Sequence, residues 1–243
     1  SFDKALAIDP NDATTWCNRG RALFILKRYE EDLDSSDKAL AIDPNDATAW
    51  CDRGVALSVL KRYDEAVDSF DKALAIDPND ATAWNNRGVA LFCLERYDEA
   101  VNSFDKALAI DPNDATTWID RGRALFILKR YNEAVDSCDK ALAIDPKSAL
   151  ACSYRGAALT ELKRYDEAVD SFDKALAIEP NDAAAGFIRG FALVALKRYQ
   201  EAVESFEQVP GQDSNSTIST LVFQGKMDAL DKLEEWLKAG GAS

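Results

Sequence analysis

A nine-residue segment recurs along this chain at intervals of 34 residues. It reads IDPNDATTW at 8–16, IDPNDATAW at 42–50 and 76–84, and IDPNDATTW again at 110–118. Weaker copies stand at 144–152 and 178–186, and KRY or ERY recurs with the same period. A fixed period of this length is typical of repeat architectures. The 243 residues are therefore better described as stacked copies of one unit than as one or two compact domains.

Each unit is expected to contain two helices. The apolar spacing predicts a first helix over about 13–26 and a second over about 30–42. Pro44 cannot continue a helix, and Asn45 or Asp46 can cap the next one. The short turn between the helices makes them antiparallel, and a single pair cannot bury its own apolar stripe. The pattern thus predicts an all-α fold in which helix pairs stack into an α-solenoid.

The apolar positions of each unit form two matching stripes. Trp16, Gly20 and Leu23 share one face of the first helix, and copies of Gly20 let another helix approach closely. The second helix carries a small, large, small stripe of Ala66, Phe70 and Ala73. The first helix thus has a bulky residue followed by Gly, the second has Ala, Phe and Ala, and a Pro closes the unit. This pattern resembles the tetratricopeptide repeat family. The resemblance implies a right-handed superhelix of 34-residue repeats that binds other proteins.

The period also predicts the boundaries of the repeats. Residues 1–12 match the tail of a preceding repeat's second helix, so the chain is expected to be a fragment of a longer solenoid. A polar linker is expected at 211–219, and a degenerate seventh repeat at 220–243 is expected to act as a C-terminal capping helix. The six repeats between them are predicted at 13–46, 47–80, 81–114, 115–148, 149–182 and 183–210.

One recurring arginine departs from the family pattern, which usually has Leu before the Gly. We expect its aliphatic stem to lie along the helix pair and its charge to reach the acidic linkers. The column consists of Arg19, Arg53, Arg87, Arg121, Arg155 and Arg189.

Four columns of the first helix vary from repeat to repeat while the frame stays constant. Cys17, Arg21, Phe24 and Ile25 project to one face, distinct from the stripe of Trp16. In the family this face lines the concave groove that holds partner segments. The partner-binding residues expected from this are Cys17, Asn18, Arg21, Phe24, Ile25, Cys51, Val55, Val59, Asn85, Asn86, Val89, Phe92, Ile119, Arg123, Phe126, Ile127, Phe187 and Phe191.

The residue types on this face suggest the chemistry of the partner. The phenylalanines would form apolar pockets, and Arg21 and Arg123 would anchor an acidic side chain, so we expect an apolar segment with some acidic character. The amides of Asn18 and Asn86 could grip a peptide backbone. In the alternative, Phe24 packs against the first helix of the next repeat.

The composition argues against catalysis and against several partner classes. The chain has no histidine, no Gly-rich phosphate loop and no carboxylate pair outside the repeat frame, so we expect no enzyme and no cofactor. The DPND linkers lack the ligand pattern of a calcium loop, so no metal site is expected. A net charge of −14 opposes nucleic-acid binding, and no apolar run is long enough to span a membrane. Five ungrouped cysteines indicate a reducing compartment, the cytoplasm.

We therefore predict a non-enzymatic scaffold that binds a partner segment in its concave groove. Two alternatives remain open. One is a self-assembly module that stacks end to end into homo-oligomers through exposed terminal repeats. The other is the targeting arm of an enzyme whose catalytic domain lies elsewhere.

The second helix of the first full repeat is unusual in this frame. Asp32 and Ser36 occupy the columns of Ala66 and Phe70. A polar pair in two core positions weakens packing unless a neighbour satisfies the carboxyl group. We expect residues 29–42 to exchange their amide hydrogens faster than residues 63–76.

Overall fold

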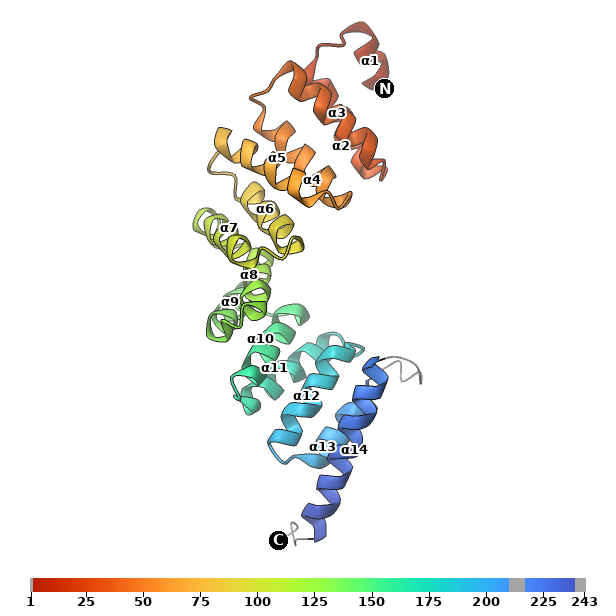
Figure 1. Ribbon diagram of the computed structural model, residues 1–243, viewed down its shortest axis with the longest axis vertical. Coiled ribbons are helices and arrows are strands. Elements are labelled where there is room, and N and C mark those ends of the chain that lie inside the picture. The colour runs from red at the N-terminus through yellow and green to blue at the C-terminus, as the bar shows by residue number, and fades with distance from the viewer. Residues whose placement is uncertain (1, 210–216, 239–243) are drawn as a thin grey trace. The chain divides into compact units, whose positions relative to one another are not determined.

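The computed structural model describes residues 2–209 and 217–238, and within the last helix the side chains of residues 224–235. Over these residues the chain forms helices joined by short turns, with no strand (Figure 1). The predicted all-α fold of antiparallel helix pairs with a 34-residue period is confirmed. The chain divides into two compact units, residues 1–124 and 125–243, and each is described by itself.

Every repeat begins with a 13-residue helix, and in all but the last its partner helix has 14 residues. The first helices are α2 (Ala13–Ile25), α4 (Ala47–Val59), α6 (Ala81–Cys93), α8 (Ala115–Ile127), α10 (Ala149–Glu161) and α12 (Ala183–Ala195). The second helices are α3 (Tyr29–Ile42), α5 (Tyr63–Ile76), α7 (Tyr97–Ile110), α9 (Tyr131–Ile144), α11 (Tyr165–Ile178) and the shorter α13 (Tyr199–Glu207). The described chain opens with α1 (Phe2–Ile8) and closes with α14 (Thr217–Lys238).

Aspartates of the linker start the helices. The Asp46 carboxylate accepts a hydrogen bond from the Ala49 backbone N–H at 3.1 Å, which satisfies a donor that has no partner within the helix. The Asp43 carboxylate accepts one from the Asn45 backbone N–H at 3.0 Å and closes the turn. Of the two caps expected from the sequence, Asp46 is the one that caps α4.

The turn inside each repeat depends on one residue with a left-handed backbone. Lys61 has φ 61°, and its N–H donates to the Ser58 carbonyl at 3.0 Å. The Arg62 N–H donates to the Leu57 carbonyl at 2.9 Å. This pair of bonds is the Schellman ending of α4, in which glycine is the usual residue at the left-handed position.

Glycine at position 61 should therefore stabilise the protein. Lys61→Gly relieves a left-handed conformation that costs an L-residue about 1–2 kcal/mol, and part of this gain is lost to unfolded-state entropy. We expect the free energy of unfolding, measured by urea denaturation, to rise by about 0.5 kcal/mol. Asp68→Gly, in the middle of α5, should lower it by about 1 kcal/mol. Equal effects of both substitutions would contradict the assignment.

In four of the repeats the core contains an aromatic ring packed on a glycine. Phe104 is fully buried, and a Cβ atom built on Gly88 would lie 2.5 Å from its Cε1. No real Cβ contact is this short, so α6 and α7 reach their observed separation only because position 88 has no side chain. The pairs Gly54 and Phe70, Gly156 and Phe172, and Gly190 and Phe206 repeat the arrangement.

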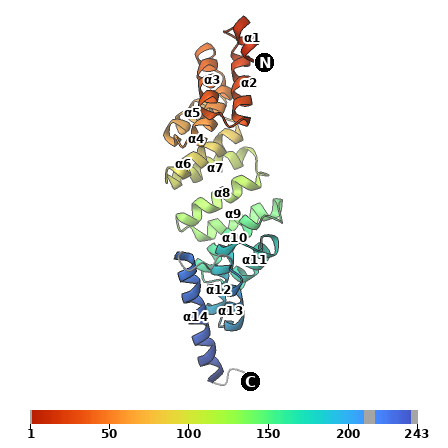
Figure 2. The same ribbon diagram turned by 90° about the vertical axis from the view of Figure 1, so that its right-hand side faces the viewer.

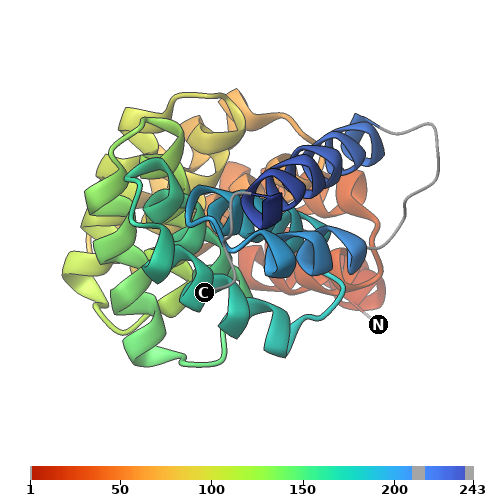
Figure 3. The ribbon, with the colours of Figure 1, turned by 90° about the horizontal axis from the view of Figure 1, so that it is seen from below.

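Helices pack in the order of the chain within each unit. In the first unit α2 packs on α3, α4 on α5 and α6 on α7, and α3 and α5 pack on the next repeat (Figure 2). In the second unit α14 lies against α13 and α12 (Figure 3). Most of the capping segment expected at 220–243 falls in this helix. Residues 211–216 of the expected linker and residues 239–243 lie outside the described part of the chain.

The recurring arginine joins three helices rather than reaching the linkers. Arg53 Nε lies 2.7 Å from Asp37 Oδ1 of α3, and its Nη1 donates to Ser69 Oγ of α5 at 2.7 Å. Its guanidinium also lies 5.8 Å from the centre of the Trp50 ring. The prediction that the arginine pairs with acidic linker residues is thus wrong. The aspartate that it contacts, Asp37, belongs to a helix of the preceding repeat and lies level with Arg53.

Candidate functional site

The variable columns of the first unit carry apolar side chains on neighbouring helices. Their helices pack side by side, α2 on α4 and α4 on α6, so equivalent positions are brought next to each other. Val59 and Val89 are exposed, at 42% and 38%, and Val55 is half-buried between them and the first repeat. We call this surface the aromatic face and define it as Phe24, Val55, Val59, Val89 and Phe92 with Tyr29, Tyr63 and Tyr97.

Tyrosines support the phenylalanines of this face. The Phe24 ring meets Tyr29 edge-on at 5.3 Å between centroids, and Phe92 meets Tyr97 at 5.1 Å. The aromatic partner of Phe24 thus belongs to its own repeat, and the Phe24 ring is half-buried. Sequence reasoning missed the tyrosines as part of the face, although KRY recurs at the period of the repeat.

The two arginines of the face have different surroundings. Arg21 Nε lies 2.8 Å from Asp52 Oδ2, so its charge is already paired. The Arg123 guanidinium lies 3.8 Å from the centre of the Phe92 ring, a cation–π contact. Burial raises the pKa of the Asp52 carboxyl, and Arg21 partly offsets that rise. Only Arg123 of the two is placed over an aromatic ring of the face.

The first variable column lies deeper than the others. Cys17 and Ile119 are both only 8% exposed, so they support the face from beneath, and Cys51 is half-buried. The Cys17 thiol donates to Asp46 Oδ2 at 3.7 Å. Burial, and then the Asp46 charge, raise the pKa of Cys17 to about 11. Burial and Asp80 raise the pKa of Cys51 to about 12, so neither thiol is a nucleophile at neutral pH.

The predicted asparagines and Ile25 lie at the edges of the aromatic face. Asn18 is exposed and Asn86 half-buried, and Ile25 is 79% exposed. The Oδ1 atom of Asn85 is buried and has no hydrogen-bond partner in the described residues.

The second unit carries its own aromatic cluster. Phe126 is half-buried against Tyr131, with centroids 5.5 Å apart, and Ile127 is 41% exposed. Phe187 and Phe191 meet edge-on at 4.8 Å, and Phe191 also contacts the buried Phe206 ring, with centroids 5.5 Å apart. Gly225 of α14 borders both Phe191 and Phe206, so part of this cluster packs against the last helix.

The first repeat contains a buried acid beside the aromatic face. Asp32 is 2% exposed, and its Oδ1 has no hydrogen-bond partner in the described residues. Burial, and then the like charge of Asp52, raise the pKa of Asp32 to about 7. The groups that share its surroundings are Arg21 from α2 and Asp52 from α4. The helix α3 nevertheless spans 14 residues, the same length as α5.

Asp32 should make stability depend on pH in an unusual direction. Its carboxyl holds a proton more tightly in the folded state, with pKa about 7, than at its ordinary value of 3.8. Its contribution to stability is therefore greatest below about pH 4 and declines as the pH rises toward 7. As the pH rises across this interval, we expect the free energy of unfolding of Asp32→Asn, measured by urea denaturation, to increase relative to that of the parent protein.

The exposed Asp34 of the same helix provides the control. Asp34→Asn removes an equal charge at the surface, so its effect should change little between about pH 4 and pH 8. If the difference in unfolding free energy between the parent protein and Asp32→Asn stays constant with pH, Asp32 is already ionised at the lower end of this pH interval.

Two other kinds of feature are absent from the described part of the chain. No group of three or more Cys, Asp or Glu side chains there is arranged to hold a metal ion. None of the described helices combines the length and the apolar character that crossing a membrane requires.

Comparisons with known proteins place the chain in a family. A profile of the tetratricopeptide repeat matches residues 47–80, 81–114, 115–148 and 149–182, and a second profile of this repeat matches residues 1–34. The protein prenyltransferase alpha subunit repeat matches residues 29–60. A search of curated proteins finds no match.

Solved structures agree with the profiles. The crystal structure of YrrB, described as a TPR protein with an unusual peptide-binding site, is 28% identical with a TM-score of 0.68, over 76% of this chain and 95% of that one. PilF of Pseudomonas aeruginosa is 20% identical with a TM-score of 0.74, over 88% and 97% of the two chains. MamA from Desulfovibrio magneticus RS-1 is 24% identical with a TM-score of 0.66, over 69% and 95%. The last two are similar in fold alone. With four consecutive matches covering more than half of its residues, the chain belongs to the tetratricopeptide repeat family.

Proposed function

We propose that this protein is a non-enzymatic scaffold that binds a segment of another protein on its aromatic face, as part of a concave groove. The observation that carries the proposal is the row of half-buried rings and exposed valines on α2, α4 and α6. Packing of the two helices within a repeat is already provided by Phe70, Phe104 and their glycines. A contiguous apolar surface that packing does not require is typical of an interaction site.

The chemistry of the face suggests a mainly apolar partner. Phe24 and Phe92 offer ring edges and faces, and Arg123 can pair with an acidic side chain while it covers Phe92. Arg21 is less suited to this role because Asp52 already neutralises it. The similarity to YrrB, whose structure is described with a peptide-binding site, supports a peptide as the ligand.

The cytoplasm is the compartment we propose for this interaction. The thiols of Cys138 and Cys152 are buried as core side chains, at 0% and 1% exposure. Thiols that serve in packing are kept reduced in that compartment.

Selection of peptides tests the function directly. A random peptide library displayed on phage is panned on the immobilised chain, and the enriched peptide is titrated by calorimetry. We expect Phe24→Ala with Phe92→Ala to weaken binding by about 30-fold or more, the effect of losing two aromatic anchors. Circular dichroism checks that the variant folds.

The control removes exposed apolar side chains elsewhere on the first unit. Ile76 and Ile110 are 40% and 39% exposed at the ends of α5 and α7. Ile76→Ala with Ile110→Ala should leave affinity within about twofold, since residues outside a contact contribute little. Equal losses in both double variants would overturn the assignment of the face.

Self-association through the first repeat is a second candidate. Ile8, Ile25 and Leu26 are the most exposed large apolar side chains of the described residues, at 87%, 79% and 64%. Exposed apolar side chains of this size favour a contact between copies of the chain. Sedimentation velocity should then show the mass rising with protein concentration, and Ile8→Ser with Ile25→Ser should return it to the monomer. A constant monomer mass excludes this candidate.

A further inference from the structure

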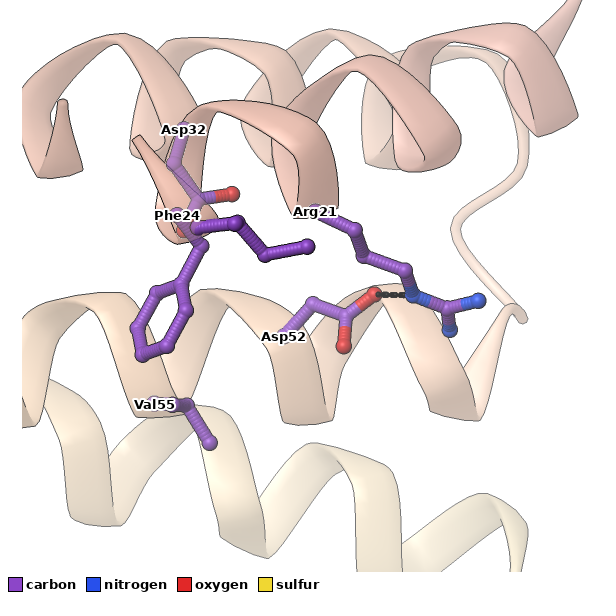
Figure 4. A pocket seen from close by; sticks show the side chains of 6 residues that line it. Arg21, Phe24, Asp32, Asp52 and Val55 are labelled. Atoms are coloured by element: carbon purple, nitrogen blue, oxygen red, sulfur yellow. Dashed lines mark hydrogen bonds and ion pairs between the residues drawn. The ribbon is translucent and has the colours of Figure 1, made fainter. Parts of the chain in front are cut away.

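The first repeat contains a cavity that opens beside the aromatic face. Its volume is about 250 Å³, and α2, α3 and α4 contribute its walls. Pockets for drug-sized ligands occupy roughly 300–1,000 Å³, so this one has room for a single long side chain. The walls are Arg21, Phe24, Ile25, Asp32, Asp52 and Val55 (Figure 4).

The cavity coincides with the two exceptional residues of α3. In the next repeat Gly54 meets the ring of Phe70, with Cε1 2.7 Å from a Cβ built on the glycine. In the first repeat Ser36 stands in the column of Phe70, and a Cβ built on the equivalent Gly20 would lie 2.7 Å from Asp32 Oδ1 instead. A carboxyl group has thus taken the place of an aromatic ring between the two helices.

Charge in the cavity is unbalanced. Two carboxyl groups, Asp32 and Asp52, share one guanidinium, and that guanidinium is bound to Asp52 at 2.8 Å and points away from Asp32 (Figure 4). Asp32 is 2% exposed and its Oδ1 lacks a hydrogen-bond partner in the described residues. A buried carboxyl group without a donor is costly, so a cation that reached it would be bound favourably.

The apolar walls define what kind of cation fits. Phe24, Ile25 and Val55 surround the entrance with hydrocarbon, whereas a metal ion needs a shell of oxygen ligands that two carboxyl groups do not complete. A long aliphatic stem ending in a positive charge matches both the walls and Asp32. Arginine and lysine side chains have this form.

We propose that this cavity binds an arginine or lysine side chain of the partner segment, with the cationic end on Asp32 and the stem against Phe24, Ile25 and Val55. The proposal rests on the proposed function, because the cavity opens among residues of the aromatic face. It places a basic anchor at the first repeat, while Arg123 remains available for an acidic one. Ionised Asp32 is the binding form, so affinity should rise as the pH passes through the raised pKa of Asp32.

A matched pair of small probes tests the cavity without knowledge of the partner. Nα-acetyl-arginine methylamide carries the guanidinium, and Nα-acetyl-citrulline methylamide has nearly the same shape without the charge. Each is titrated into the full chain and followed by carbon and nitrogen NMR. We expect saturable shifts at Phe24, Ile25 and Val55, with the arginine probe binding about tenfold or more tightly, as a charge-assisted hydrogen bond predicts.

Variants assign the effect to the buried acid. Asp32→Asn should abolish the preference for arginine, and Asp34→Asn, which removes an exposed charge of the same helix, should retain it. Asp32→Ala with Ser36→Phe restores the residues of the second repeat and should abolish binding in a well-folded protein. Binding of citrulline with equal affinity, an undiminished preference in Asp32→Asn, or no saturable shift would each overturn the proposal.

The peptides enriched on the aromatic face separate this inference from the proposed function. If they contain an arginine or lysine whose replacement by norleucine weakens binding to the parent protein but not to Asp32→Asn, the basic anchor is established. If they bind through Phe24 and Phe92 with no such residue, the scaffold function stands and the cationic site is wrong.

Discussion

Phe104→Ala is expected to lower the free energy of unfolding by about 3–5 kcal/mol, the range for removing a fully buried ring. Phe104 is 0% exposed, and its ring lies directly on Gly88. Substitution to alanine leaves a void between α6 and α7 that the glycine side cannot fill. Urea denaturation measures the loss in free energy.

The same substitution should act locally as well as globally. Because each repeat contacts mainly its neighbours, hydrogen exchange should lose protection first in α6 and α7. Phe92→Ala, which removes a half-buried ring from the surface of α6, is the control and should cost clearly less. A loss below about 1 kcal/mol for Phe104→Ala would mean that the glycine and phenylalanine columns do not hold the repeats together.

Asp32→Ala with Ser36→Phe is expected to raise the free energy of unfolding by about 3 kcal/mol. Burying a phenylalanine side chain contributes about 1.5–3 kcal/mol, and removing a buried unpaired carboxyl group contributes about 1–3 kcal/mol. The double variant gives α3 the residues that α5 has at Ala66 and Phe70. Amide protection of residues 29–42 should rise to that of residues 63–76.

The two single variants show why both changes are required. Ser36→Phe alone brings a ring toward Gly20, where the carboxyl group of Asp32 already lies. Asp32→Ala alone removes the acid but leaves the space empty. We therefore expect the double variant to exceed the sum of the single ones, a positive coupling between neighbouring sites. A double variant no more stable than the parent would show that the first repeat is already fully packed.

This stabilisation also gives the cationic site a physical explanation. Asp32 and Ser36 lower the stability of one repeat out of six, and the requirements of folding alone do not explain why the chain has them. In the double variant stability and binding of the arginine probe should change in opposite directions. That relation is the one expected when a binding site is built at the expense of core packing.

Much of the candidate site could be predicted, but its interactions could not. The column of Phe24 and Phe92 stands out because it varies while the frame repeats, and simple helical geometry places it on one face with the columns of Cys17, Arg21 and Ile25. The sequence does not indicate that Tyr29 supports Phe24, nor that Arg21 pairs with Asp52 of the next repeat. Both contacts depend on the separation and rotation of neighbouring helices, which the period leaves undetermined.

The arginine column illustrates the same limit. Arg53 is recognisable as a departure from the family pattern, and burying its stem follows from its position beside Gly54. Its partner Asp37 lies 16 residues earlier, on the second helix of the previous repeat. Whether Arg53 pairs with this aspartate or with those of the linker depends on how far one helix pair is displaced along the next.

By itself, the sequence determined the period, the helix pairs and the contact of glycine with phenylalanine, because local propensity and apolar spacing specify them residue by residue. It also marked Asp32 and Ser36 as exceptions within an otherwise regular frame. Only the tertiary structure decided that the carboxyl group of Asp32 lines a cavity and that its Oδ1 has no hydrogen-bond partner among the described residues. Burial and charge balance are properties of three helices packed together, α2, α3 and α4, and no single segment of the chain contains them.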